Sequence, residues 1–203
     1  LKTQTSDWIY RNKSVKYFFN DKGYRCPDFD TIDWPNSVVL FGCSMTSCVG
    51  LDESDTLSSN LSQILNIPVI SLGVAGTSPQ FNFDNSLKLK ENFPEPKCVI
   101  HLWSEYSRTV DYAQKIKHNG LGWAHANTTV PEAHLAVNAT NYHIASKHLW
   151  NNYLAYSFFT STTILLNIPE LPTVDLARDL KHYGKITSKL AATRIAKDIL
   201  KII

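Results

Sequence analysis

Residues 37–50 read SVVLFGCSMTSCVG, and the feature that decides the fold is the apolar run that ends at glycine. The run over 37–41 is short and rich in β-branched residues, which is typical of a buried strand. A stretch with helical spacing follows from about 56 to 65, and its apolar positions are Leu57, Leu61, Ile64 and Leu65. The sequence therefore predicts a strand, a sharp turn at Gly42 and a helix with one buried face.

The same alternation continues along the chain. Residues 68–72 (PVISL) and 98–103 (CVIHLW) are two further strand candidates, and a helix is predicted between them over 79–92. Beyond them we expect a long helix over 141–159, a fourth strand over 162–168 and a closing helix over 186–203. Strands that are apolar on both faces and alternate with helices form parallel sheets covered on two sides. We predict one α/β domain, a three-layer α/β/α fold with a flavodoxin-like, doubly wound parallel sheet.

Two segments fall outside this alternation. Residues 1–36 are aromatic and polar without clear periodicity, and we expect them to form an arm that packs across the main domain, residues 37–203. Residues 111–138 are irregular, and we interpret 113–140 as an insertion or lid.

Composition excludes several classes of protein. Hydrophobic residues make up 43% of the chain and charged residues 19%, which is a globular balance. The net charge of +2 is too small to favour nucleic-acid binding, and no apolar run approaches the roughly 18 residues that cross a bilayer. We therefore expect no nucleic-acid and no membrane partner, and the sequence leaves the oligomeric state open.

The cysteines and the first residues bear on the cellular compartment. Four cysteines occur without a CxxC pair, so their spacing matches no zinc site, and a chain of this size needs no disulfide staples. We expect buried free thiols in a reducing environment. The opening LKTQTSDWIY is too polar for a signal peptide, and we expect a cytoplasmic protein.

Three segments carry residues suited to chemistry. In an open parallel sheet, ligands bind where loops leave the carboxyl ends of the strands, and Ser44 follows the first predicted strand. Gly76 follows the second strand, where its backbone N–H can face a developing negative charge. Near the chain end, Asp179 and His182 are three residues apart, so the carboxylate can orient the imidazole that takes the serine proton. Taken singly, each has a simpler reading, as a turn or as a solvated pair at a helix start.

Jointly, these segments resemble the SGNH (GDSL-type) hydrolases. The first family block, Gly-Asp-Ser, is matched by residues 42–44, and the second, Asn-x-Gly-x-x-Gly-x-Ser, is similar to residues 71–78. The last block, Asp-x-x-His, is matched by residues 179–182, and the resemblance covers about 37–203. It implies that Ser44 attacks an ester carbonyl, that His182 is general base and acid, and that Asp179 orients His182. It also implies an oxyanion hole made by the N–H groups of Ser44 and Gly76 with a third donor.

The chain departs from the family pattern at two places. Cys43 replaces the aspartate of the first block, and as a rival nucleophile it has no neighbour in the sequence that lowers its pKa. The third block, Gly-x-Asn-Asp in the family, reads LWSEYSR over 102–108, so the asparagine donor is missing. Ser104 or Tyr106 can replace it as a donor, whereas an ionised Glu105 can only accept. Arg108 binds an anionic group of the substrate or pairs with Glu105; we expect the pair, and we assign 105, 106 and 108 to substrate binding.

The resemblance implies a small serine esterase without metal or organic cofactor. By analogy the substrate is an O-acetyl ester of a carbohydrate. Two other functions stay open: a binding or structural module that has lost catalysis, favoured by the missing asparagine, and an O-acyltransferase that uses the same triad. Histidines in or near the irregular stretch match no metal-ligand spacing (His118, His125, His134 and His143).

Overall fold

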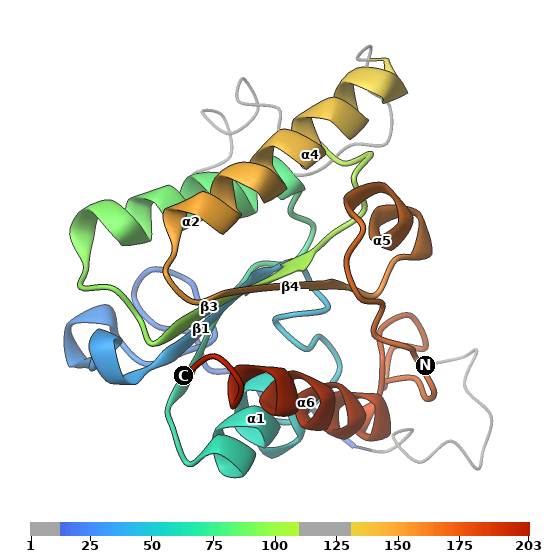
Figure 1. The fold of residues 1–203 in the computed structure, drawn as a ribbon. Coiled ribbons are helices and arrows are strands. Elements are labelled where there is room, and N and C mark those ends of the chain that lie inside the picture. Colours follow the sequence, from blue (N-terminus) through green and yellow to red (C-terminus); the bar gives the residue numbers. More distant parts are fainter. Residues whose placement is uncertain (1–12, 110–130) are drawn as a thin grey trace.

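The computed structural model of the protein describes residues 13–109 and 131–203, and it contains one sheet of four parallel strands. The strands are β1 (Val38–Gly42), β2 (Val69–Gly73), β3 (Cys98–Trp103) and β4 (Tyr153–Ser157), in the order β2-β1-β3-β4. Figure 1 shows helices on both faces of this sheet, α2 and α4 on one side and α1 and α6 on the other. The predicted three-layer α/β/α fold with a parallel sheet is therefore confirmed.

The first half of the chain folds as its sequence pattern predicts. Helices α1 (Leu57–Leu65) and α2 (Pro79–Asn92) follow β1 and β2. The side chains of Thr56 and Ser78 cap them by accepting a hydrogen bond from the N–H three residues further on. Such caps satisfy N–H groups that the first helical turn leaves without a partner, and they fix where each helix begins.

Two predictions for the second half are wrong. The helix expected over 141–159 is α4 (Glu132–Leu149), which begins earlier and ends where β4 starts shortly afterwards. The strand expected over 162–168 is instead helix α5 (Thr160–Leu166), and the fourth strand is β4. Of the predicted insertion, residues 113–130 lie outside the described residues, and residues 132–140 belong to α4 rather than to an irregular loop.

Local contacts explain both differences. Trp150 leaves the helical conformation with φ −119° and ψ 138°, and its indole Nε1 donates to Ser86 Oγ at 2.9 Å, so α4 stops there. In α5, the hydroxyl groups of Thr162 and Thr163 donate to the carbonyls of Ser104 and Thr160, whereas Ile164 is 76% exposed. A short β-branched run is compatible with strand or helix by pattern alone, and here these hydrogen bonds favour the helix.

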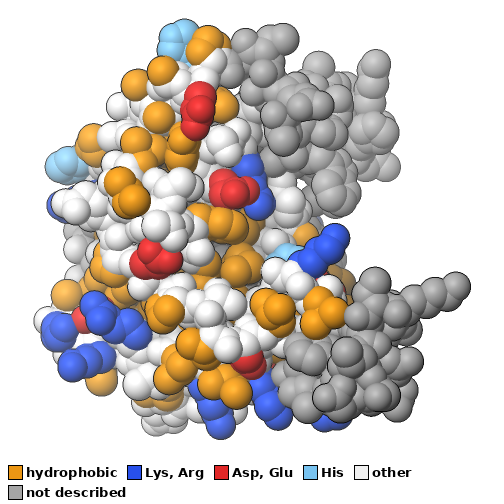
Figure 2. All heavy atoms as spheres, turned by 90° about the vertical axis from the view of Figure 1, so that its right-hand side faces the viewer, with side chains coloured by type: hydrophobic (Ala, Val, Ile, Leu, Met, Phe, Trp, Pro, Cys, Tyr) orange, Lys and Arg blue, Asp and Glu red, His pale blue; other side chains and the backbone are white. Residues whose placement is uncertain are grey.

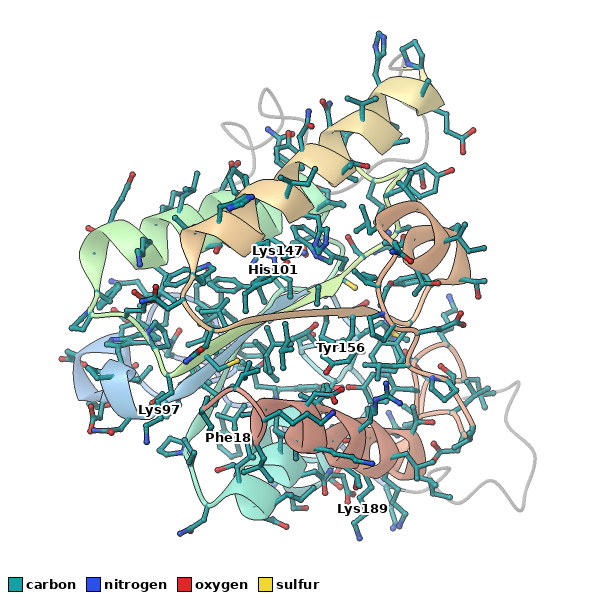
Figure 3. The ribbon with its side chains drawn as sticks, in the orientation of Figure 1. Phe18, Lys97, His101, Lys147, Tyr156 and Lys189 are labelled. Carbon is teal, nitrogen blue, oxygen red and sulfur yellow. The ribbon has the colours of Figure 1, made fainter. Side chains whose placement is uncertain are left out.

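The core lies on both faces of the sheet because successive strand residues point to opposite sides. Val38 and Leu40 of β1 pack towards α1 and α6, whereas Val39 and Phe41 pack on the α2 side with Trp150. Figure 3 shows His101 on the α4 side of the sheet and Tyr156 on the opposite side, facing α6. The closing helix α6 (Lys185–Ile199) buries one face and keeps its lysines exposed.

The cysteines and the helices bear on two further predictions from the sequence. All four cysteines are free thiols, of which Cys43, Cys48 and Cys98 are buried and Cys26 is half-buried. Among residues 13–109 and 131–203, none of the helices combines the length and the apolar character needed to cross a bilayer.

Candidate active site

Ser44 lies in the loop that leaves β1, at the carboxyl end of the sheet, and it is half-buried. The loop turns sharply because β1 and β2 both end in glycine, and Gly42 and Gly73 are register partners. Thr46 and Ser47 fill the space above them: a Cβ on Gly73 would lie 2.6 Å from Thr46 Cβ. The two glycines therefore allow the turn after Ser44 to sit directly on the strand ends.

Asp179 and His182 form a compact unit in the loop before α6. The Asp179 Oδ2 and His182 Nδ1 atoms are 2.5 Å apart, and Asp179 Oδ1 accepts from the backbone N–H groups of Lys181 and His182. Leu180 takes a left-handed conformation with φ 59°, which curls the chain around the carboxylate. Burial, the largest single influence, opposes ionisation of Asp179, but the hydrogen bonds from His182 and Lys181 outweigh it and lower the pKa of Asp179.

The Ser44 loop and the Asp179–His182 loop pack against each other. Cys48 Sγ and the Tyr183 hydroxyl are 3.1 Å apart, and both side chains are buried. A Cβ on Gly50 would lie 2.8 Å from Ala177 Cβ and 3.6 Å from Asp179 Oδ1, so the loops touch there as well. Residues up to 135 positions apart thus meet at one edge of the sheet, although no hydrogen bond between the described atoms joins the Ser44 hydroxyl to His182.

Cys43 has the properties of a structural thiol. It is fully buried, and this burial raises the pKa of the Cys43 thiol despite the nearby Ser44 hydroxyl and the positive charge of Arg108. A thiol must ionise to be a nucleophile, so these surroundings disfavour Cys43 in that role.

Gly76 lies in the loop that leaves β2, next to the Ser44 loop. This loop is tied to the end of β1, because the Val74 N–H donates to the Gly42 carbonyl at 3.0 Å and the Thr77 hydroxyl donates to the same oxygen. Gly76 has φ +78°, a conformation that favours glycine. It is half-buried, which leaves its backbone partly accessible at the edge where Ser44 lies.

The third loop, after β3, holds the predicted substrate-binding residues. Glu105 and Arg108 form the expected ion pair, with Glu105 Oε2 3.1 Å from Arg108 Nη2, and the guanidinium also lies over the Phe159 ring. The Tyr106 hydroxyl donates to Glu132 at the start of α4. Ser104 is fully buried, and its hydroxyl has no hydrogen-bond partner among the described residues. Its donor capacity is therefore unused in this conformation.

Figure 2 looks onto this end of the sheet. Hydrophobic side chains are interspersed there with single acidic and basic ones, and Lys and Arg side chains gather towards the lower edge. Among the described residues, no group of three or more His, Cys, Asp or Glu side chains is arranged to hold a metal ion.

Sequence reasoning missed three residues of this region: Arg25, Cys48 and Tyr183. The buried Arg25 guanidinium contacts the loop after Ser44, and the Cys48–Tyr183 contact joins the two loops. Only the position of Tyr183 beside His182 is a signal in the sequence, and it does not reveal the partner.

Comparison with solved structures finds several proteins with a similar fold. An acetyl xylan esterase, Est2A, from the rumen bacterium Butyrivibrio proteoclasticus aligns with TM-score 0.57 and 10% identity over 84% of this chain and 64% of its own. TesA aligns with TM-score 0.54 and 10% identity over 82% and 99% of the two chains. A member of the lipolytic protein G-D-S-L family from Veillonella parvula aligns with TM-score 0.51 and 9% identity over 82% and 99%. What this chain shares with them is the fold.

No protein-family model matches the chain, and no curated protein matches it.

Proposed function

Because the chain has the fold of the SGNH (GDSL-type) hydrolases, we propose that it is a serine esterase with Ser44 as nucleophile and His182 and Asp179 as its partners. The observation that carries the proposal is the 2.5 Å contact between His182 Nδ1 and Asp179 Oδ2, in a loop packed against the Ser44 loop. An ionised carboxylate on Nδ1 leaves the other ring nitrogen, Nε2, free to accept a proton.

The proposed reaction proceeds through an acyl-enzyme. Ser44 Oγ attacks the acyl carbonyl while His182 Nε2 takes the hydroxyl proton, and the negative charge of the tetrahedral intermediate forms on the carbonyl oxygen. His182 then gives the proton to the departing alcohol as the C–O bond breaks. Water, deprotonated by His182, then attacks the acyl carbonyl. The bond from the carbonyl carbon to Ser44 Oγ breaks, His182 returns the proton to this oxygen, and the carboxylic acid leaves.

The oxyanion hole that we propose uses the N–H groups of Ser44 and Gly76 and the hydroxyl of Ser104. The Ser104 hydroxyl donates to no described residue, which supports its assignment to the oxyanion hole. Because Ser104 is buried, a small shift of the loop after β3 has to expose this hydroxyl to the substrate. Loss of one such donor lowers kcat by roughly 10²–10³-fold, so a rearranged third donor predicts slow turnover of generic esters.

We further propose that the substrate is a small acyl ester, with an O-acetylated carbohydrate as the favoured class. The similarity in fold to an acetyl xylan esterase and to a carbohydrate esterase family 2 enzyme supports this class. Glu105, Tyr106 and Arg108 are the proposed contacts with the alcohol portion. Their charged and hydroxyl groups lie in the loop after β3 and suit a polar alcohol better than a lipid chain.

The test is p-nitrophenyl acetate hydrolysis by the wild type, Ser44→Ala and His182→Ala. Ser54→Ala and His148→Gln, which alter an exposed serine and an exposed histidine, are the matched controls. We expect both site variants to lose most of the activity and both controls to keep it. A wild type that is no faster than Ser44→Ala would contradict the proposal and favour a binding module that has kept the fold.

A further inference from the structure

Arg25 lies in the N-terminal arm, but its side chain is inserted into the main domain and is only 3% exposed. Its guanidinium donates four hydrogen bonds. Nη1 reaches the carbonyl oxygens of Ser47 and Cys48 at 3.2 and 3.1 Å, Nη2 reaches that of Leu51 at 2.9 Å, and Nε reaches Glu53 Oε2 at 2.9 Å. A buried charge with this many partners is fixed in place, because each lost partner leaves a desolvated donor unpaired.

The carbonyls that Arg25 binds belong to the irregular loop between Ser44 and α1. Cys48 has φ 54°, a conformation that non-glycine residues rarely adopt, and its carbonyl is one of the three. Tyr17 of the same arm adds to the contact, because its hydroxyl accepts from the Gly50 N–H at 2.7 Å and its ring lies 4.9 Å from the Arg25 guanidinium carbon. The arm therefore holds the backbone of residues 47–51 through four hydrogen bonds.

The same loop contacts the residues that hold His182. Cys48 Sγ lies 3.1 Å from the Tyr183 hydroxyl, one residue after His182, and also accepts from the Leu57 N–H at 3.2 Å. Cys48 thus contacts three parts of the protein. Its carbonyl oxygen accepts from Arg25, and its sulfur contacts both α1 and the His182 loop. Cys48 therefore lies in the loop that follows Ser44 and contacts the residue next to His182.

We propose that Arg25 is a positioning residue that sets the distance between Ser44 and His182 through Cys48 and Tyr183. The inference rests on the proposed esterase function, and it makes the N-terminal arm part of the active-site structure. A planar guanidinium can donate to three carbonyls and a carboxylate at once. The ammonium group of a lysine instead carries all its donors on a single nitrogen atom.

The first measurement compares kcat and KM of the wild type with Arg25→Lys and Arg194→Lys. Arg194 is exposed on α6 and pairs with Asp198, so it is a matched control for the same chemical change. We expect Arg25→Lys to lower kcat by roughly 10- to 100-fold with KM little changed, because misplaced groups lose rate rather than ground-state binding. An Arg25→Lys variant whose activity falls only in proportion to its unfolded fraction would overturn the proposal.

A second measurement does not depend on catalysis. The rate at which iodoacetamide alkylates Cys48, located by peptide mass spectrometry, reports whether the loop is still held. We expect slow alkylation in the wild type and in Arg194→Lys, and at least roughly tenfold faster alkylation in Arg25→Lys. Equal rates in all three would overturn the role of Arg25. The wild type could instead prove inactive while Cys48 is alkylated faster in Arg25→Lys. That result would reject the esterase function but support the role of Arg25 in fixing the loop.

Discussion

Gly73 ends β2 directly beneath the loop that carries Ser44, and its replacement by alanine is a sharp test of how that loop is supported. A methyl group at this position would lie 2.6 Å from Thr46 Cβ, 2.7 Å from the Ser47 nitrogen and 2.9 Å from the Thr46 carbonyl carbon. Two of these three atoms are backbone atoms, so rotation of a side chain cannot relieve the contacts. Either β2 or the loop has to move.

We expect the loop, rather than β2, to move. β2 is held by parallel pairing with β1 along its whole length, from Val69 to Gly73. Ordinary contact begins at 3.4 Å, so the loop must move by about 0.7 Å to clear the Ser47 nitrogen. Overpacking of this kind costs about 1–3 kcal/mol of stability. A displacement approaching 1 Å at a catalytic nucleophile lowers kcat by on the order of 10²-fold.

The assay is steady-state ester hydrolysis at a temperature where each variant is fully folded by circular dichroism, with urea denaturation run in parallel. Leu89→Ala is the control: Leu89 lies near the end of α2, is buried and packs on the opposite face of the sheet from Cys48, so this variant loses about 2–5 kcal/mol through a cavity alone. We expect Gly73→Ala to lose both stability and kcat, and Leu89→Ala to lose only stability. A Gly73→Ala enzyme with wild-type kcat would show that the loop position does not depend on the glycine.

Three further predictions concern stability and the triad. His101 is fully buried among aromatic rings on the α4 side of the sheet (Figure 3), and burial lowers its pKa from 6.5 to about 3. Between these values the unfolded chain binds a proton that the folded chain does not, so the free energy of unfolding falls as the pH falls, by up to roughly 1.4 kcal/mol per pH unit. The urea midpoints measured at pH 7 and at pH 5.5 should therefore differ less in His101→Leu than in the wild type or in the exposed control His148→Gln. An equal fall of the midpoint with pH in all three proteins would contradict this. Asp179→Asn should lower kcat by on the order of 10²–10⁴-fold in a protein with an unchanged circular dichroism spectrum, and a kcat within a few-fold of wild type would remove Asp179 from the triad. Leu61→Ala, at a position of α1 with no exposed surface, should lower the free energy of unfolding by about 2–5 kcal/mol in urea, and a loss well below this range would show that the site collapses around the smaller side chain.

The first half of the fold could be predicted because local and tertiary signals agree there. The helix over 79–92 and the strand over 98–103 have the bounds that the sequence indicated, and the strands at β1 and β2 differ by one residue. Their apolar runs are buried on both faces, and Ser78 and Pro79 mark the start of α2. A run that is apolar throughout has no exposed face whose position could be misassigned.

The second half could not be predicted because its signals are weak or tertiary. β4 is only partly buried at its first three residues, so its composition does not stand out from the helix before it. The end of α4 depends on Trp150, whose partner Ser86 is 64 residues away. The threonines of α5 resemble a strand in composition, and their hydroxyl contacts become visible only in three dimensions.

Some residues of the candidate site could likewise be predicted from the sequence, and others could not. Asp179 and His182 could be predicted because their spacing of three residues is local, and the structure pairs them. Arg25 could not, because its partners are backbone carbonyls 22 to 26 residues away, and a backbone carbonyl leaves no trace in the sequence. The burial of Ser104 follows from packing under α5, which the sequence assigned to a strand.

The most direct test of the central claim is labelling with a fluorophosphonate probe, followed by peptide mass spectrometry to locate the adduct. A serine reacts rapidly only when a base activates it and donors stabilise the oxyanion. We predict one adduct, on Ser44, formed rapidly in the wild type and at a strongly reduced rate in His182→Ala. An unlabelled Ser44, or an adduct that forms at the same rate without His182, would contradict the account.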